Sequence, residues 1–420
     1  MIYHSPPFPL VLDYGPRILK TWSVEDEMGL LFASQHLPRI TEIVLSAPDL
    51  TLAKLTTGLT EAAPRLKTLI LHSQTSEVVL PKQFLEGGTP QLRHLTLTGT
   101  ALSPLQPLLS SATSLVSLVL ERIPSSAYFS PDSLITLISA MPQLQILSLG
   151  FLSTVPRPGF RGEQRVFPRV QAARTELPSL TRLIYRGVSA YIEALLSRIR
   201  VPHIEDLDIS LFNQLTLDVP RACSFIRELD TLRPTKARID FTESSAHITL
   251  SAPHPATSPD IFLSVSCTRL DFQVSATAQL CAGLSTALDP AEELVLGCYY
   301  GALPDEWREE EVDTGLWRAL LAPFCHVGTL QVHVALVADL ERALRLTDQM
   351  PVLLLPEMRE IVLLHASDEN ALKSASAALG AFIDERDGAG CPVKVRSLDL
   401  SGLAENESGE PITIHRRELY

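Results

Sequence analysis

The stretch Leu92-Arg93-His94-Leu95-Thr96-Leu97 decides the fold, because its pattern L-x-x-L-x-L returns along almost the whole chain. Clear copies are Leu66/Leu69/Leu71, Leu115/Leu118/Leu120 and Leu144/Leu147/Leu149. Looser copies are Ile40/Ile43/Leu45, Leu180/Leu183/Tyr185, Ile204/Leu207/Ile209, Cys267/Leu270/Phe272, Met358/Ile361/Leu363 and Val395/Leu398/Leu400. Three weaker copies begin at Lys236, Ala291 and Val327. A pattern repeated so often predicts one structural unit used many times.

The spacing and the internal alternation of the pattern predict the unit. Clear copies start roughly 20–30 residues apart, which is the period of a leucine-rich repeat. Alternate residues of a strand point to opposite faces, so Leu69 and Leu71 should point inward while Ile70 points outward. Successive parallel strands need a crossover, usually a helix. We therefore predict an α/β leucine-rich-repeat solenoid of 12–13 irregular repeats, with a parallel sheet on its concave face and helices on its convex face.

Local signals place some of the helices. Ser23 and Asp26 form a predicted capping box before an apolar stretch. Ser130 followed by Pro131 predicts a helix start, because serine caps well and proline fits the first helical turn. The segment 371–384 shows apolar residues at helical spacing.

The repeat series sets the predicted domain organisation. We expect a single solenoid over residues 1–403, beginning with a strand–helix cap at 1–36. The predicted irregular segments are a loop insertion at 151–177, a protruding β-hairpin at 245–266, an acidic loop at 301–315 and a polar C-terminal tail at 404–420.

Composition narrows the class of partner. The formal charge of −13 argues against a nucleic-acid backbone or an anionic membrane as the main partner. The six cysteines show no metal-ligand spacing, and the first residues do not read as a secretory leader. We expect a monomer in the cytoplasm or nucleus that binds no nucleic acid and no membrane.

The sequence contains no recognisable catalytic motif. A phosphate-binding glycine loop, H-E-x-x-H, G-x-S-x-G and a kinase signature are all absent. We predict that the protein is not an enzyme and uses neither a metal nor another cofactor.

Charged residues gather at the outward positions of the middle repeats. They are Arg182, Arg186, Asp206, Asp208, Arg238, Asp240, Arg269 and Asp271. On an in-register parallel sheet Asp208, Asp240 and Asp271 would stack as a column beside Arg238 and Arg269. One interpretation is an Arg/Asp ladder that neutralises itself on a solvated face; another is a recognition patch for a protein partner. A bound cation is the third.

The outward positions nearer the N-terminus are apolar or weakly polar. Val44, Ile70, Thr96 and Val119 should form a row of mostly β-branched side chains, and His94 should point outward beside them. The row reflects either simple packing between neighbouring strands or an apolar surface that binds a partner. We include Ile70 and His94 among the candidate partner-binding residues.

Several segments resemble the region that follows the F-box in the large F-box/leucine-rich-repeat family of mushroom-forming fungi. They are Phe8 to Tyr14, Thr21 to Glu27, Leu30 to Ala33, Pro90 to Leu97, Ser126 to Phe129, Gly187 to Leu196, Phe212 to Thr216 and Phe382 to Asp384. The matches are spread over nearly the whole chain, and they are specific to the family rather than to a biochemical activity.

The resemblance implies a function. Family members carry an F-box that docks the adaptor of an SCF-type ubiquitin ligase, and their repeats read the substrate. This sequence has no F-box segment, so we expect either a truncated form or an F-box-less member. Adaptor docking is therefore expected only if an F-box lies upstream of Met1. The predicted function is a protein-interaction scaffold that resembles the substrate-recognition region. The alternatives are a non-ubiquitin scaffold or degenerate copy, and an enzyme using outward Asp and His groups.

Overall fold

The computed structural model contains two compact units. Unit 1 comprises Met1–Gln214 and Asp218–Ala222, and unit 2 comprises Leu215–Leu217 and Cys223–Tyr420. The structure describes residues 8–14, 23–73, 78–86, 88–101, 107–124, 127–152, 174–212, 217–229, 233–252, 260–298, 305–308, 312–345, 353–365 and 369–400. The predicted tail at 404–420, residues 153–173 of the first predicted loop, and residues 301–304 and 309–311 of the second lie outside these residues.

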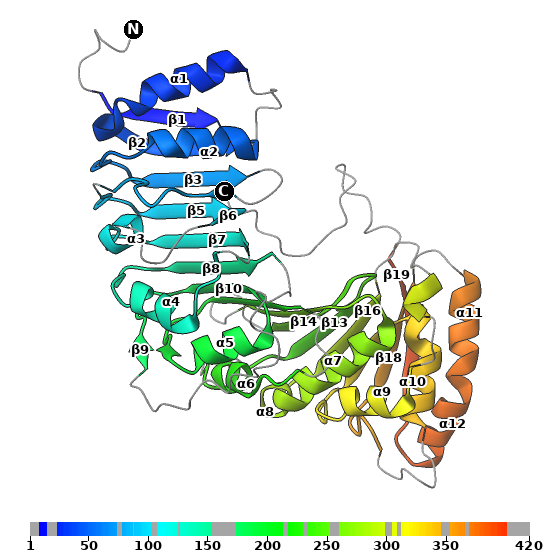
Figure 1. Ribbon diagram of the computed structural model, residues 1–420. Coiled ribbons are helices and arrows are strands. Elements are labelled where there is room, and N and C mark those ends of the chain that lie inside the picture. Colours follow the sequence, from blue (N-terminus) through cyan, green and yellow to red (C-terminus); the bar gives the residue numbers. More distant parts are fainter. Residues whose placement is uncertain are drawn as a thin grey trace, which may run out of the picture. The chain divides into compact units, whose positions relative to one another are not determined.

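Unit 1 contains an entirely parallel sheet in which each strand pairs with its neighbour in the repeat series (Figure 1). Its strands, in order, are β1 (Leu10–Tyr14), β2 (Ile40–Ala47), β3 (Thr68–Ser73), β5 (His94–Thr98), β7 (Ser117–Ile123), β8 (Ile146–Phe151), β10 (Arg182–Gly187) and β12 (Asp206–Leu211). Two small two-stranded sheets accompany it: β4 (Val78–Val79) with β6 (Thr100–Ala101), and β9 (Thr175–Glu176) with β11 (Ile199–Arg200).

The inward leucines of unit 1 stack in register. Leu69, Leu95, Leu118 and Leu147 are direct neighbours on successive strands, and all four are fully buried. Burying one leucine side chain contributes about 1.5–3 kcal/mol, so a ladder repeated strand after strand supplies a continuous core. The predicted inward and outward assignment of the repeat is confirmed here.

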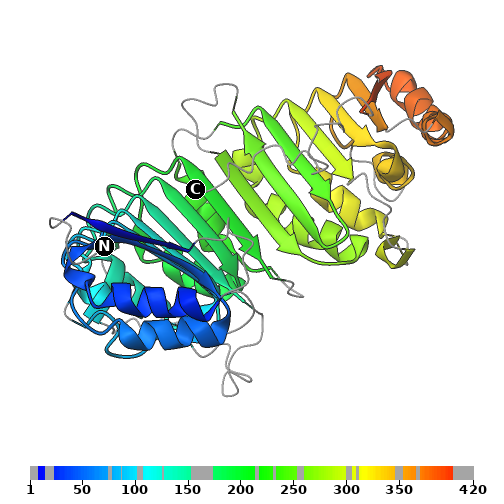
Figure 2. The ribbon, with the colours of Figure 1, turned by 90° about the horizontal axis from the view of Figure 1, so that it is seen from above.

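Helices cover one face of the unit 1 sheet (Figure 2). They are α1 (Val24–Ser34), α2 (Asp49–Gly58), α3 (Pro107–Ser111), α4 (Pro131–Ile138) and α5 (Ser189–Leu196), with the 3-10 turn η2 (Leu37–Arg39). Helix α6 (Pro220–Arg227) follows β12. Both predicted caps are present: Ser23 and Asp26 cap α1 reciprocally, and the Ser130 hydroxyl accepts the Ser133 N–H at the start of α4.

The sheet of unit 2 mixes directions. Its order is β15 (Asp260–Ser266), β14 (Ser245–Ser251), β13 (Lys236–Phe241), β16 (Glu293–Cys298), β17 (Thr329–His333), β18 (Glu360–His365) and β19 (Lys394–Asp399). Strand β14 runs antiparallel to both β13 and β15, whereas the pairs from β13 to β19 are parallel. The hairpin predicted at 245–266 is therefore present, but it does not protrude. Its strand β14 is hydrogen-bonded on both sides, and burying both edges inside the sheet satisfies the backbone groups that a protruding hairpin would leave to water.

Helices also gather on one face of the unit 2 sheet (Figure 2). They are α7 (Leu270–Gly283), α8 (Ser285–Leu288), α9 (Thr314–Leu321), α10 (Val337–Leu344), α11 (Glu369–Ala378) and α12 (Gly380–Gly388), with the 3-10 turns η4 (Asp305–Arg308) and η5 (Val334–Leu336). The single helix predicted over 371–384 is two helices, which meet at Leu379 and Gly380.

Two predicted repeat copies are wrong. The copy Cys267/Leu270/Phe272 is not a strand, because α7 begins at Leu270 and its apolar residues pack as a helix. The copy Val395/Leu398/Leu400 is out of register. Val395 pairs with Ile361, and Leu398 pairs with Leu364, so Leu398 lies on the opposite face from the one predicted. A three-residue error in register exchanges the two faces of a strand.

In both unit 1 and unit 2, the strands and helices together form a leucine-rich-repeat α/β architecture. In each unit the face opposite the helices, here called the open face, carries the outward positions of the repeat. The prediction of one continuous solenoid over 1–403 stays a prediction.

Candidate functional site

The open face of unit 1 carries the predicted β-branched row. Val44 pairs with Ile70, Ile70 with Thr96, and Thr96 with Val119 across four successive strands. Val44, Ile70 and Thr96 are half-buried, and Val119 is buried. Neighbouring strands lie about 4.8 Å apart, so these side chains form a narrow apolar band across the strands. Its sequence-based placement is confirmed.

Histidines flank this band on both sides. His94 is exposed and lies opposite Ser117. His72 lies nearer the ends of the strands, where burial and the nearby Arg122 guanidinium lower its pKa. A half-buried neutral imidazole can accept or donate one hydrogen bond without carrying a charge, which suits a mixed apolar and polar contact surface.

The charged residues of unit 1 neutralise each other in part. Arg182 and Asp206 are register neighbours on β10 and β12, and the Arg182 Nε lies 2.8 Å from the Asp206 Oδ2. The Ser210 hydroxyl donates to the Asp208 carboxylate at 3.3 Å. Arg186 is exposed and forms no ion pair with any part of the chain that the structure describes. Of the interpretations considered from the sequence, a ladder of Arg and Asp side chains that neutralise each other describes Arg182 and Asp206 better than a recognition patch of free charges.

The predicted charges of unit 2 also form a pair. Arg238 Nε and Nη2 donate to the two carboxylate oxygens of Asp240 at 2.5 Å and 2.8 Å, two positions along the same strand. Gly297 lies directly opposite Asp240 on β16, and a Cβ at Gly297 would overlap the Asp240 carboxylate. The fork-shaped pair therefore depends on a glycine in the next repeat. Further along the sheet, Lys236 pairs with Glu293 at 2.7 Å.

Arg269 and Asp271 are not outward strand residues. Arg269 precedes α7 and Asp271 lies in its first turn, where the two side chains form their own pair at 3.2 Å. The acidic side chain suits the positive end of the helix dipole. These two residues therefore leave the set of sheet-face candidates.

The predicted column of Asp208, Asp240 and Asp271 does not form. The neighbours of Asp240 in the sheet are His247 on β14 and Gly297 on β16, and Asp271 is helical. Strand order, and not repeat number, decides which side chains stack. The predicted column assumed that consecutive copies are consecutive strands, and the antiparallel pairs of β14 break that assumption.

A serine–histidine contact on β14 was missed from the sequence. The Ser245 hydroxyl lies 2.8 Å from the His247 Nε2, and the His247 ring stacks on Phe262 at 5.2 Å between centroids. Burial lowers the pKa of His247, so the ring is neutral at pH 7. The only signal was the alternation His247-Ile248-Thr249-Leu250, which predicts a strand but not its neighbours.

This contact lacks the rest of a catalytic arrangement. The Asp240 carboxylate is held by Arg238, and the buried His247 Nδ1 has no hydrogen-bond partner among the described residues. A base that activates serine is normally oriented by a hydrogen bond at its second nitrogen. In the same described part of the chain, no group of three or more His, Cys, Asp or Glu side chains could hold a metal ion.

The open face of unit 2 carries an apolar cluster instead of an exposed apolar row. Val295, Val362 and Leu364 are 1%, 2% and 4% exposed, and Leu400 packs against them. Val295 and Val362 both lie opposite Gln331 of the strand between them. This cluster was also missed, because the shifted copy assigned Leu400 to the inward face.

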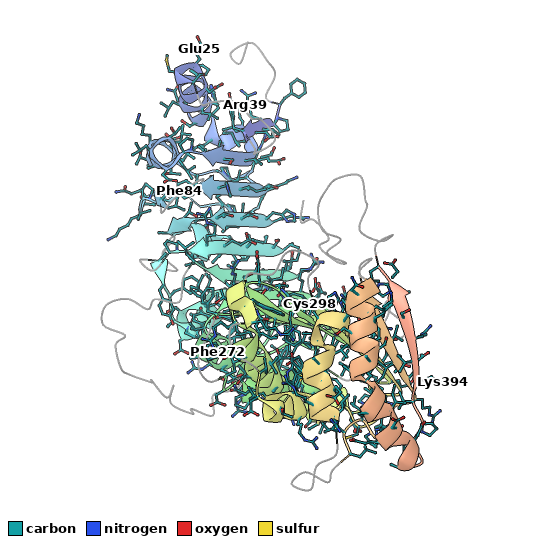
Figure 3. All side chains as sticks on the ribbon, turned by 90° about the vertical axis from the view of Figure 1, so that its right-hand side faces the viewer. Glu25, Arg39, Phe84, Phe272, Cys298 and Lys394 are labelled. Carbon is teal, nitrogen blue, oxygen red and sulfur yellow. The ribbon has the colours of Figure 1, made fainter. Side chains whose placement is uncertain are left out.

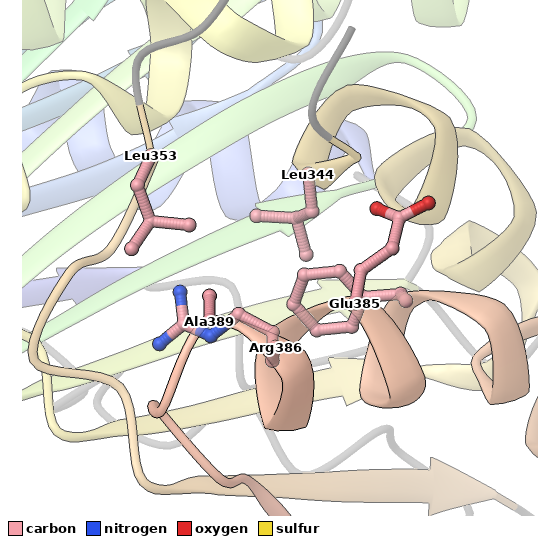
Figure 4. Close-up of a pocket in the computed structure, with 6 residues that line it drawn as sticks. Leu344, Leu353, Glu385, Arg386 and Ala389 are labelled. Carbon is pink, nitrogen blue, oxygen red and sulfur yellow. The ribbon is translucent and has the colours of Figure 1, made fainter.

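A small hollow lies beside α12 (Figure 4). Its lining residues are Leu344, Leu353, Phe382, Glu385, Arg386 and Ala389. The Arg386 guanidinium donates to the carbonyl oxygens of Leu354, Leu355 and Met358 at 3.1–3.3 Å and is 2% exposed. Buried hydrogen bonds of this kind fix a loop, so we assign Arg386 a structural role.

Every residue of β19, the outermost strand of unit 2, is exposed, and Lys394 marks the start of this strand (Figure 3). None of the described helices is long and apolar enough to cross a membrane.

Comparison with known proteins yields little. No family model matches the chain, and no curated protein matches it. Among solved structures, the chain is similar to the leucine-rich-repeat-containing protein LegL7 from Legionella pneumophila. That similarity has 12% sequence identity, covers 79% of this chain and 94% of that chain, and gives a TM-score of 0.30. Strand register and the burial of the inward leucines define the fold.

Proposed function

We propose that the protein is an interaction scaffold that binds a protein partner through the open face of unit 1. The observation that carries this proposal is the band of Val44, Ile70, Thr96 and Val119 on the helix-free face. Protein interfaces combine an apolar centre with a polar rim, and the band has that composition. His94, Arg186 and the paired Arg182 and Asp206 supply the rim.

The remaining candidates contribute in different ways. Asp208 extends the rim of unit 1, whereas Arg238 and Asp240 lie on the open face of unit 2 and satisfy each other. A fully paired fork offers a partner little free hydrogen-bonding capacity. We therefore rank the unit 1 residues above Arg238 and Asp240 as contacts.

The finer proposal is that the partner is a substrate of an SCF-type ubiquitin ligase. It is supported by the resemblance of the chain to the repeat region of fungal F-box proteins and by the repeat architecture. The adaptor would bind only through an F-box upstream of Met1. A scaffold without ubiquitin chemistry is the main alternative, and the weak repeat copies at Lys236, Ala291 and Val327 favour a degenerate member of the family.

Catalysis is the least supported function. The contact between Ser245 and His247 is its best geometric argument, and the argument against it is that no described residue hydrogen-bonds the His247 Nδ1. The proposal also keeps a monomer in the cytoplasm or nucleus. Nucleic acid and membranes are not proposed as partners, because the chain is acidic overall.

Proximity labelling in cells tests the proposal when a surface variant is compared with a matched control. Ile70→Asp places a charge in the centre of the band, whereas Val79→Asp places it at a 65% exposed position on β4. The expected result is a set of labelled proteins that Ile70→Asp loses and Val79→Asp keeps. Identical sets for the two variants would contradict binding at the band. Ubiquitin-ligase subunits among the labelled proteins, together with an F-box encoded upstream of Met1, would support the proposal that the partner is a ligase substrate. The absence of both would favour a scaffold without ubiquitin chemistry.

A further inference from the structure

Two basic residues of unit 1 lie next to each other where β3 and β5 begin (Figure 1). Lys67 directly precedes β3, and Arg93 directly precedes His94, the first residue of β5. The Arg93 N–H donates to the Lys67 carbonyl oxygen at 2.8 Å, so the two residues are direct neighbours on adjacent strands. Both side chains are exposed, and neither forms an ion pair with any residue that the structure describes. These two residues are here called the basic edge.

Charges at two other strand entrances are compensated by the neighbouring strand. Arg182 pairs with Asp206 at 2.8 Å, and Lys236 pairs with Glu293 at 2.7 Å. The basic edge instead places two charges of the same sign on neighbouring strands, and like charges in that arrangement destabilise a sheet. An anionic group from another molecule would compensate both charges.

The basic edge lies close to the apolar band of unit 1. Lys67 is three residues from Ile70, and Arg93 is three residues from Thr96, which corresponds to about 10 Å of extended chain. His94 lies between the basic edge and the band, is exposed on the open face, and has a ring that can donate a hydrogen bond to a carboxylate. One short segment of a partner can therefore contact both the cations and the band.

We propose that the basic edge binds the carboxylates of an acidic segment in the protein partner, and that apolar side chains of the same segment cover the band. The inference rests on the proposed binding at the open face of unit 1 and specifies the chemistry of the partner. Arginine and lysine hold carboxylates through charge-assisted hydrogen bonds. Glu42 of β2 lies beside Thr68 and repels carboxylates, so the segment extends from Lys67 toward Arg93 and away from β2.

A short acidic segment suits this surface better than a nucleic acid does. The chain carries a formal charge of −13, which repels a long polyanion over the rest of its surface. A phosphate backbone also offers no apolar side chain that could cover Ile70. Protein interfaces, in contrast, combine an apolar centre with a charged rim.

Fluorescence anisotropy of labelled peptides tests the proposal at low ionic strength, where the charges are weakly screened. The first peptide alternates glutamate with leucine, the second replaces every glutamate with lysine, and the third replaces every leucine with serine. The first should bind most tightly, the second should not bind, and the third should bind more weakly because it cannot cover the band. No binding of the first peptide, equal binding of the first and second, or tighter binding of a single-stranded oligonucleotide would each overturn the proposal.

Charge reversal locates the site. The double variant Lys67→Glu/Arg93→Glu should weaken binding of the glutamate–leucine peptide by about tenfold or more, and should gain binding of the lysine–leucine peptide. Arg359→Glu/Lys394→Glu is the matched control with the same change in net charge. Its two exposed residues are also neighbours, because the Lys394 N–H donates to the Arg359 carbonyl oxygen at 2.9 Å. They lie in unit 2, where Val362 is 2% exposed, and the control should bind the peptide as the original chain does. Equal weakening in both variants would overturn the proposal.

The variant Ile70→Asp separates this inference from the proposed function. Loss of peptide binding in Ile70→Asp and in Lys67→Glu/Arg93→Glu, with the control unchanged, is the expected result. Loss in Ile70→Asp alone would refute the basic edge and leave the band as the binding surface. Loss in the charge-reversed variant alone would refute the band and leave the basic edge as the contact. Circular dichroism of every variant checks that the fold is intact.

Discussion

The open faces of the two units differ in how they treat apolar side chains. In unit 1 the band around Ile70 and Thr96 is half-buried and faces outward. In unit 2 the equivalent face buries Val295 and Val362 almost completely, and its charges, such as Arg238 and Asp240, are paired. The same repeat thus produces two open faces that differ in how far their outward apolar side chains are buried. An outward position in the repeat is therefore not sufficient to make a residue part of a binding surface.

The inward ladder is where the two units should behave alike. Leu97→Ala in unit 1 and Leu296→Ala in unit 2 each remove a side chain that is 1% or 0% exposed. Each should lower the free energy of unfolding by about 2–5 kcal/mol, because both lose buried area and leave a cavity. Chemical denaturation followed by circular dichroism measures the loss. A cost below 1 kcal/mol in one unit only would show that its core is not built from the ladder.

A glycine substitution breaks the paired charges of unit 2. Gly297→Ala places a Cβ against the Asp240 carboxylate and should separate it from Arg238, at a cost of about 1–3 kcal/mol. Gly328→Ala is the matched control, since the nearest atom to its new Cβ lies 3.9 Å away. Equal stability of the two variants in urea would show that the pair is not constrained by Gly297.

Acid should destabilise unit 2 more than unit 1. Burial lowers the pKa of His247 and His333 in unit 2, and of His72 in unit 1, below the ordinary 6.5. The unfolded chain then binds more protons than the folded chain below pH 6.5, so stability falls as pH drops through that value. The exposed His326 acts in the opposite direction, because its hydrogen bond with Glu357 raises its pKa.

Hydrogen exchange at pH 7.5 and pH 5.5 measures this difference strand by strand. The expected result is a larger loss of protection in β14 and β17 than in β3. His333→Gln should reduce the acid sensitivity of β17 and leave that of β3 unchanged. Equal sensitivity of β17 in the two proteins would rule out His333 as the cause.

The smallest expected effect is at the surface ion pair of unit 1. Arg182→Ala should cost less than about 1 kcal/mol, because the Arg182 and Asp206 side chains are 26% and 36% exposed and water screens the pair. Unfolding in urea measures the change, which should shrink further at high salt. A cost above 2 kcal/mol would mean that the ladder is a structural element of β10 and β12 rather than a solvated pair.

The errors of the sequence-based prediction lie outside the run of strands from β2 to β12. The motif assigned inward and outward residues correctly from β2 to β12, where each copy is followed by the next strand of the sheet. It failed at Leu270, where apolar spacing fits a helix as well as a strand, and at Val395, where the register depends on the pairing with Ile361. Short apolar runs do not distinguish helix from strand by themselves.

The candidate site shows the same division. Ile70, His94 and the neighbours Arg182 and Asp206 could be placed on the outward face from the pattern alone. The contact between Ser245 and His247, the room that Gly297 leaves for Asp240, and the cluster around Val362 could not. The first is a contact within one strand that the alternation did not single out, and the other two depend on which strand lies beside which, an order that no local spacing encodes.

The sequence by itself determined the repeat unit, its α/β class and the parity of its leucines from β2 to β12, because these follow from the period of strand and helix along a single segment. The tertiary structure alone decided the strand order of β13 to β16, the pairing of Arg182 with Asp206 across two strands and the burial of Val295 and Val362. Those features arise from hydrogen bonds and contacts between residues far apart in the chain, so they exist only once the strands have paired.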